Sequence, residues 1–260
     1  MALAASATVS GLAGAQQPAP SPITGNLTLA SEYRFRGIDQ TFGKPAIQGG
    51  FDYTHASGVY LGNWNSNVSQ GAGYPGSNLE MDFYGGYKRA FGDFGLDVGA
   101  IYYYYPGSDA SLLGAANPHS SSTNSGTVHN TEFYVGGSWK WISLKWFHSL
   151  SDYFMVPDTD GTNYYDLSAT FDLGSGWGVN GHVGSLKVQG YSEADYTDYK
   201  LGVTKDLSGW LLGAALVGTN AKGSCPFNAT TSPYCFGNSS FTQSKDAGRN
   251  TLVLSVGKTF

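Results

Sequence analysis

The chain has 260 residues, including 37 Gly and 18 Tyr, and only 13% are charged. An ordinary globular protein carries roughly 25% charge. The net charge is −5 and the longest basic run is Lys88-Arg89, so the sequence lacks the basic surface that nucleic-acid binding requires. The excess of Tyr, Gly and small polar residues favours short, tightly turned strands and argues against an all-helical fold.

Residues 1–23 differ in composition from the rest of the chain. An apolar run of small residues ends in Ala13-Gly14-Ala15, which has the form of a signal-peptide cleavage site, and a Pro-rich spacer follows. The usual Lys or Arg at the start is missing, so a disordered Ala/Pro tail is the alternative interpretation. We interpret residues 1–23 as a signal-peptide remnant with its spacer, and residues 24–260 as one barrel domain.

Apolar and polar residues alternate with a period of two from Leu27 onward, which predicts strands with one apolar face. In the first segment Leu27, Leu29, Tyr33 and Phe35 fall on one face, and the charged side chains fall on the other. The predicted strands are 25–37, 45–54, 58–67, 78–90, 94–105, 129–140, 142–152, 162–173, 177–188, 196–206, 209–219 and 249–260. Each is close to the 9–11 residues, or slightly more, that a tilted strand needs to cross a bilayer.

The connections between these strands alternate between long and short. The long ones are 38–44, 68–77, 106–128, 153–161, 189–195 and 220–248; the short ones are 55–57, 91–93, the corner at 141, 174–176 and 207–208. Bacterial outer-membrane barrels show this asymmetry, with short turns on the periplasmic side and long loops outside. A soluble β-sandwich, the structural alternative, gives no reason for such regular alternation.

The predicted fold is therefore all-β: a transmembrane, antiparallel, up-and-down β-barrel, most simply of 12 strands, with short periplasmic turns and long extracellular loops. Closure is required because every backbone polar group in hydrocarbon must find a protein partner. The longest apolar stretch, 210–218, is too short for a membrane-spanning helix, which needs ~20 residues. The expected location is the outer membrane of a Gram-negative bacterium.

The last strand and the aromatic residues indicate contacts with the membrane and with its assembly machinery. Alternating apolar residues and a terminal Phe260 resemble the signal read by the barrel-assembly machinery, although Lys258 departs from that pattern. Outer-membrane lipid and lipopolysaccharide are the expected surroundings, and a homo-oligomer is left open. The aromatic residues expected near the two headgroup levels are Trp139, Trp141, Trp146, Trp177, Trp210, Tyr33, Tyr53 and Tyr87.

The chain has two cysteines, Cys225 and Cys235, both in the long segment 220–248. In an exported protein, two cysteines this close are expected to form a disulfide, here one that closes part of an outer loop.

The polar faces of the predicted strands supply the candidate functional residues. They are Glu32, Arg34, Arg36, Asp52, Glu80, Asp82, Lys88, Asp97, Glu132, Lys140, Lys145, Asp166, Asp172, Asp198 and Lys200. We expect these side chains to line the pore, where opposite charges on adjacent strands tune ion selectivity. Acidic residues outnumber basic ones, which favours a weak preference for cations. The alternative is a network of ion pairs that plugs the lumen and conducts little.

No pattern in the sequence indicates an enzyme, a metal site or a cofactor. The five histidines form neither an HExxH motif nor a Cys/His metal spacing. The glycines at 176, 178 and 181 satisfy GxGxxG, but they open a predicted strand and lack the βαβ context of a dinucleotide site.

Residues 25–68 carry a family resemblance. The most specific pieces are Tyr33-Arg34-Phe35-Arg36-Gly37, the stretch 45–50 (PAIQGG) and the stretch 58–64 (GVYLGNW), with weaker likeness over 80–87 and in the closing Lys258-Thr259-Phe260. Together they resemble the TorF-type family, proteobacterial outer-membrane proteins classed as porins by inference from fold and long known as conserved proteins of unknown function. The resemblance implies a barrel and suggests a channel, without naming a solute.

Two functions follow from these predictions. The first is a porin-like channel for passive diffusion of small hydrophilic solutes or ions through a charged lumen. The second is a structural or interaction barrel whose extracellular loops bind a partner, a surface polymer or neighbouring copies. The long Tyr- and Asn-rich loops and the loop disulfide motivate the second.

Overall fold

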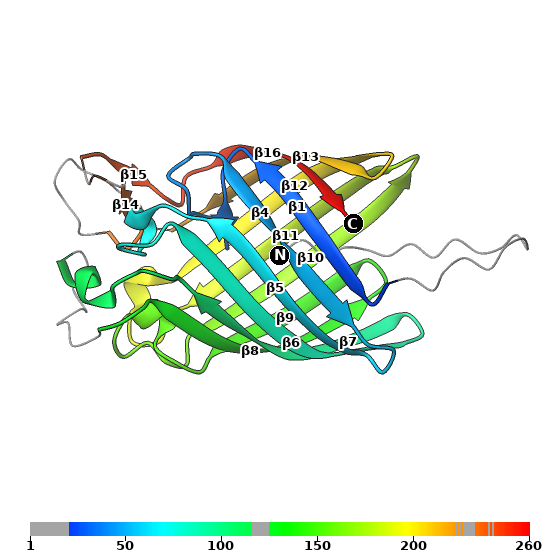
Figure 1. Ribbon diagram of the computed structural model, residues 1–260, viewed down its shortest axis with the longest axis horizontal. Coiled ribbons are helices and arrows are strands. Elements are labelled where there is room, and N and C mark those ends of the chain that lie inside the picture. The colour runs from blue at the N-terminus through cyan, green and yellow to red at the C-terminus, as the bar shows by residue number, and fades with distance from the viewer. Residues whose placement is uncertain are drawn as a thin grey trace, which may run out of the picture.

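A computed structural model describes residues 21–115, 125–221, 223, 225, 232–238, 240 and 242–260. Twelve antiparallel strands form a closed barrel, because β1 (Ile23–Ala30) pairs with both β4 (Ala46–Thr54) and β16 (Thr251–Thr259) (Figure 1). The other nine strands are β5 (Val59–Asn67), β6 (Leu79–Phe91), β7 (Phe94–Tyr104), β8 (His129–Trp139), β9 (Ile142–Ser149), β10 (Asn163–Gly174), β11 (Trp177–Lys187), β12 (Tyr196–Leu207) and β13 (Trp210–Thr219). The predicted fold and strand count are confirmed. The predicted signal segment lies mostly outside the described residues.

Tight turns join the strands at one end of the barrel, which we call the periplasmic end. Two of these turns consist of Ser175-Gly176 and Ser208-Gly209, and all four residues have positive φ. Positive φ at both central residues is the requirement of a type I′ turn, whose twist matches that of the flanking strands. The long connections all lie at the other, outer end, as the alternation of connection lengths predicts.

The outside of the barrel is apolar around its circumference. Leu201, Leu216 and Leu167 each expose more than half of their surface on this side, and their strand neighbours point into the lumen. Such exposure of large aliphatic side chains is costly in water but matches a hydrocarbon surrounding. No helix among the described residues is both long enough and apolar enough to cross a membrane.

The predicted first strand is wrong at its outer end. It continues to Gly37 in the prediction, but β1 ends at Ala30, and residues 31–45 turn into the barrel. Within this stretch β2 (Arg34–Phe35) and β3 (Ile38–Asp39) form a very short hairpin. We call residues 31–45 the inserted segment. Tyr33 is consequently buried among other side chains rather than at the lipid surface, and Phe35 contacts residues inside the barrel.

Four predicted interface aromatics lie where they were expected. Trp139, Trp141, Trp177 and Trp210 flank the tight turns, and each exposes between 43% and 51% of its surface. Amphipathic rings at this height suit the headgroup region of a bilayer. Tyr33 was predicted to belong to this set, and that prediction is wrong because the residue lies inside the barrel.

The outer connections contain small elements of their own. They are the 3-10 turns η1 (Gln70–Ala72), η2 (Ala110–Ala115), η3 (Tyr153–Met155) and η4 (Ser192–Ala194), and the hairpin of β14 (Cys235–Gly237) and β15 (Ser244–Asp246). The hairpin projects beyond the left end of the barrel in Figure 1. Cys225 and Cys235 form the predicted disulfide, with Cα atoms 5.3 Å apart.

Candidate functional site

The inserted segment fills the lumen at the outer end of the barrel. Lumen-facing side chains there are buried, as with Tyr164 on β10 and Tyr196 on β12. Toward the periplasmic end the lumen-facing residues of the same strands become exposed, as with Asp172 and Asp206. The barrel therefore has a packed outer half and a more open periplasmic half.

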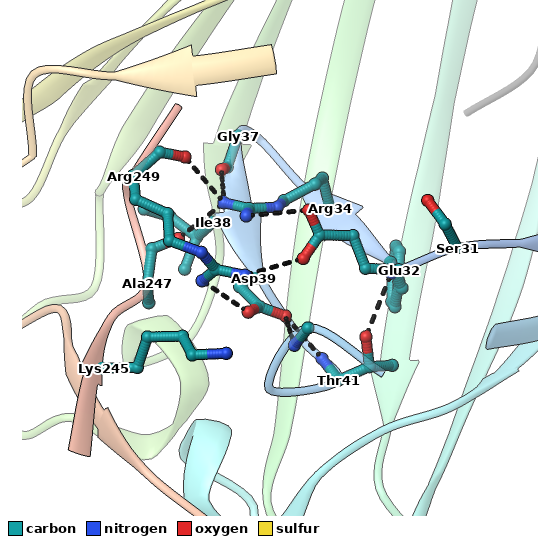
Figure 2. Close-up of polar contacts among 12 residues, drawn as sticks. Ser31, Glu32, Arg34, Gly37, Ile38, Asp39, Thr41, Lys245, Ala247 and Arg249 are labelled. Atoms are coloured by element: carbon teal, nitrogen blue, oxygen red, sulfur yellow. Dashed lines mark hydrogen bonds and ion pairs between the residues drawn. The ribbon is translucent and has the colours of Figure 1, made fainter. Parts of the chain in front are cut away.

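Ion pairs join the inserted segment to the last outer connection, as Figure 2 shows. The guanidinium group of Arg249 contacts Glu32 at 2.8 Å and Asp39 at 2.7 Å. Arg34 contacts the other oxygen of Glu32 at 3.0 Å and donates to the backbone carbonyls of Ala247 and Arg249. Burial lowers the pKa of Arg34 from its ordinary value, despite the opposing effect of Glu32. Arg34 and Arg249 thus both contact the Glu32 carboxylate. Together they tie the inserted segment to residues more than 200 positions later in the sequence.

A second ion pair holds the tip of the inserted segment against the barrel wall. Arg36 reaches Glu132 of β8 through two hydrogen bonds of 2.9 and 2.6 Å. Its guanidinium group also lies over the rings of Tyr164, at 4.1 Å, and Phe147, at 5.1 Å. Burial acts to lower the pKa of Arg36, but the Glu132 carboxylate outweighs it and the pKa lies well above its ordinary value. The cation therefore touches three consecutive strands, β8, β9 and β10.

Aromatic rings fill the space around these ion pairs. Phe154, from the connection between β9 and β10, lies 5.9 Å from Phe35 and 5.5 Å from Tyr103, measured between ring centroids. It also contacts Tyr105, a fully buried residue that directly follows β7. Phe154 has a φ of 50°, which a non-glycine residue rarely adopts, so the surrounding packing must hold it there.

The local conformation of the inserted segment follows from a few residues. Gly37 has a φ of 79° and lies so close to Thr219 and Asp198 that a Cβ atom would meet both. Asp39 then accepts hydrogen bonds from the backbone N–H groups of Thr41 and Gly43, which stabilises the following turn. Glycine at position 37 therefore lets the segment pack directly against β12 and β13.

Other predicted residues form separate ion pairs in the lumen. Lys145 contacts Asp97 at 2.6 Å. His182 lies between two of the predicted carboxylates, 3.2 Å from Asp166 and 2.5 Å from Asp198. Asp166, His182 and Asp198 lie on the consecutive strands β10, β11 and β12, whereas Lys145 of β9 reaches Asp97 of β7 across the intervening β8.

Fourteen of the fifteen predicted pore-lining residues lie inside the barrel. Three of them, Glu32, Arg34 and Arg36, belong to the inserted segment rather than to a wall strand. The prediction for Lys140 is wrong, because this residue lies in the periplasmic turn after β8. Its side chain is half exposed, and its amine lies 3.8 Å from the Asp93 carboxylate. The others project from wall strands: Asp52, Glu80, Asp82, Lys88, Asp97, Glu132, Lys145, Asp166, Asp172, Asp198 and Lys200.

The sequence prediction missed further titratable residues of the lumen, among them Asp39, Arg249 and His182. Asp39 lies in a connection, where strand periodicity gives no signal. Arg249 was the first residue of the predicted last strand, 249–260, but it lies in the connection before β16. His182 lies on β11 with Val183 pointing outward, so the alternation along that strand would have placed it inside. Among the described residues, no group of three or more His, Cys, Asp or Glu side chains is arranged to hold a metal ion.

Comparison with known proteins places the chain in a family. A family model described as "Bacterial protein of unknown function (Gcw_chp)" matches residues 14–260. The chain belongs to this family. A search of curated proteins gives no match.

Solved barrels resemble this Gcw_chp protein in fold. The KdgM porin is 7% identical, with 91% of this chain and 98% of that chain covered and a TM-score of 0.50. The NanC porin is 8% identical, with 92% and 98% covered and a TM-score of 0.49. A loop-deletion mutant of OmpT, an outer-membrane protein of Vibrio cholerae, is 10% identical, with 92% and 98% covered and a TM-score of 0.44. The KdgM comparison agrees with the closed barrel described above.

Proposed function

We propose that this protein is an outer-membrane channel for small hydrophilic solutes or ions, and that the inserted segment closes its outer half. The observation that carries the proposal is the contrast along the lumen: polar and exposed toward the periplasm, packed shut toward the outside. The resemblance of residues 25–68 to the TorF-type family supports the same class. An outer-membrane location, lipid and lipopolysaccharide as surroundings, assembly through the strand ending at Phe260, and the absence of enzymatic activity belong to this proposal.

The contacts of the inserted segment suit a reversible closure. Its attachments include ion pairs, Arg36 with Glu132 and Arg249 with Glu32 and Asp39. Buried ion pairs add little net stability compared with apolar packing, because desolvation of the charges offsets their attraction. They do fix one arrangement over others when the geometry is specific. Such a segment can be released without dismantling the barrel wall, whose strands pair independently of it.

Measurement of single-channel conductance in planar bilayers tests the proposal. Ala30 and Ala46 face each other across the β1–β4 ladder, so an Asn-Gly turn can replace residues 31–45 without moving either strand. We expect small or infrequent conductance steps from the intact chain and larger, persistent ones from the shortened variant. Asp93→Asn, in an exposed periplasmic turn, is the matched control and should behave as the intact chain does.

Absence of discrete conductance from both the intact and the shortened protein, each shown to be folded, would contradict the channel proposal. It would favour the structural or interaction barrel instead. Equal conductance from the two would leave a channel but remove the closing role of the inserted segment.

A further inference from the structure

Two buried carboxylates in the lumen stand apart from the ion pairs described above. Glu80 and Asp82 project from β6 into the lumen two residues apart, so they share one face of the strand. Glu80 is 0% exposed and Asp82 is 6% exposed. Side chains at this spacing are neighbours on the strand face, so the two carboxyl groups are close enough to interact electrostatically. Glu132, Asp97 and Asp198 each face an Arg, Lys or His, whereas no described basic residue pairs with Glu80 or Asp82.

Buried oxygen atoms of this pair and of the neighbouring Tyr105 lack a hydrogen-bond partner among the described residues. Glu80 accepts a hydrogen bond from the Tyr33 hydroxyl at 3.0 Å through Oε1. Its Oε2 atom, Asp82 Oδ1 and the hydroxyl of Tyr105 are buried without a hydrogen-bond partner. Tyr105 is fully buried and interacts electrostatically with Glu80. Oxygen atoms from three buried side chains are thus gathered in one place, and no basic side chain in the described part of the chain forms an ion pair with them.

The surroundings increase the cost of leaving these charges uncompensated. The ring of Tyr33 packs 5.3 Å from that of Trp64, and the ring of Tyr105 stacks on Tyr74 at 3.7 Å. Aromatic packing lowers the local dielectric constant and strengthens both the repulsion between like charges and the attraction for a cation. A buried charge without a partner costs several kcal/mol, so such groups are paired or coordinate metals.

We propose that Glu80 and Asp82, with the hydroxyl of Tyr105, bind one divalent cation of the Ca²⁺ type. Two carboxylates supply the two negative charges that balance such an ion. The donors are all oxygen, which suits Ca²⁺ and offers no nitrogen or sulfur to a softer metal. Ca²⁺ also tolerates irregular coordination and completes its shell with water or backbone oxygen. The binding does not depend on whether the barrel conducts.

Terbium luminescence tests this site directly. Tb³⁺ takes Ca²⁺ positions, and nearby tyrosines such as Tyr33 and Tyr105 transfer excitation energy to it. We expect the purified full-length protein in detergent to give saturable luminescence on tyrosine excitation, reversed by Ca²⁺ and not by K⁺. Glu80→Gln and Asp82→Asn should each weaken Tb³⁺ binding by about tenfold or more, since affinity depends on ligand charge.

The control is Glu193→Gln, the same change at an exposed carboxylate of the outer end, and it should bind as the intact chain does. As a second measurement, Ca²⁺ should raise the thermal stability of the intact protein, and a chelator should reverse the effect. Absence of saturable luminescence from the intact chain would overturn the proposal in favour of two carboxyl groups that share a proton. Undiminished binding in folded Glu80→Gln and Asp82→Asn variants would also overturn it.

Discussion

The substitution Glu132→Gln isolates the contact that holds the tip of the inserted segment. It keeps the shape of the side chain and removes the negative charge that faces Arg36. The change leaves the Arg36 guanidinium buried without its counter-charge, in a pair whose side chains are only 5% and 2% exposed. Removal of one partner from a buried ion pair is more damaging than removal of both.

The expected cost follows from the remaining contacts of Arg36. Breaking a buried pair from one side costs about 3–5 kcal/mol. The rings of Phe35 and Tyr164 stay in contact with the cation, and glutamine keeps one oxygen acceptor, so the lower end applies. A loss of about 3 kcal/mol shifts the equilibrium between the docked and released segment by roughly 100-fold, since 1.4 kcal/mol is a factor of ten.

Hydrogen exchange of the backbone amides measures this shift without assuming conduction. Two backbone amides are suitable reporters. The N–H of Asp39 donates a hydrogen bond of 2.9 Å to the carbonyl oxygen of Ala247, and the N–H of Gln40 donates one of 2.9 Å to the carbonyl oxygen of Tyr33. Their protection should fall by about 100-fold, because exchange reports the free energy of local opening. Backbone amides in the centre of β12 should keep their protection from exchange.

The double variant Arg36→Met with Glu132→Gln provides the matched comparison. It removes both charges, so the segment should regain part of the lost protection, giving a coupling energy between the two sites. Unchanged protection in Glu132→Gln would refute the idea that this ion pair holds the segment. An equal loss throughout the barrel would mean that the pair stabilises the whole fold instead.

Three further predictions concern the wall, the turn and the outer loop. Leu201→Lys places a charge at the middle of β12 on the lipid side, where the residue is 62% exposed. It should lower the free energy of unfolding by about 2–4 kcal/mol in a urea titration in lipid, and an equally stable variant would contradict a lipid-facing position. Gly37→Ala forces a Cβ atom to 2.5 Å from Thr219 Cγ2 at a φ of 79°, so exchange should rise in the inserted segment while the barrel stays folded. Unaltered exchange would show that the segment has another way to fit. Replacement of Cys225 and Cys235 by Ser should speed proteolysis of the last outer connection and leave barrel unfolding unchanged, because the bond closes a loop of only 10 residues. A large drop in barrel stability would count against that local role.

The barrel was predictable from the sequence because each of its strands is specified by a pattern of neighbouring residues. Each strand has one side in hydrocarbon and the other in the lumen, and consecutive side chains of a strand point to opposite sides. Leu201 and Lys200 on β12 illustrate this, since neighbours in the sequence lie on opposite faces of the wall. The alternation of apolar and polar residues therefore determines which residues form strands and which side chains point inward. The connection lengths predict which end of the barrel carries the long loops.

The inserted segment was not predictable because the same alternation fits two structures. Charged and aromatic residues take turns from Glu32 to Arg36 whether the chain continues along the wall or folds into a hairpin within the lumen. Its conformation depends on partners far away in the chain, with Arg36 and Glu132 96 residues apart and Glu32 and Arg249 217 apart. Only closure of the barrel brings these groups together. Local pattern thus determined the wall of this protein, whereas the contents of its lumen were decided by contacts that exist only after the wall has closed.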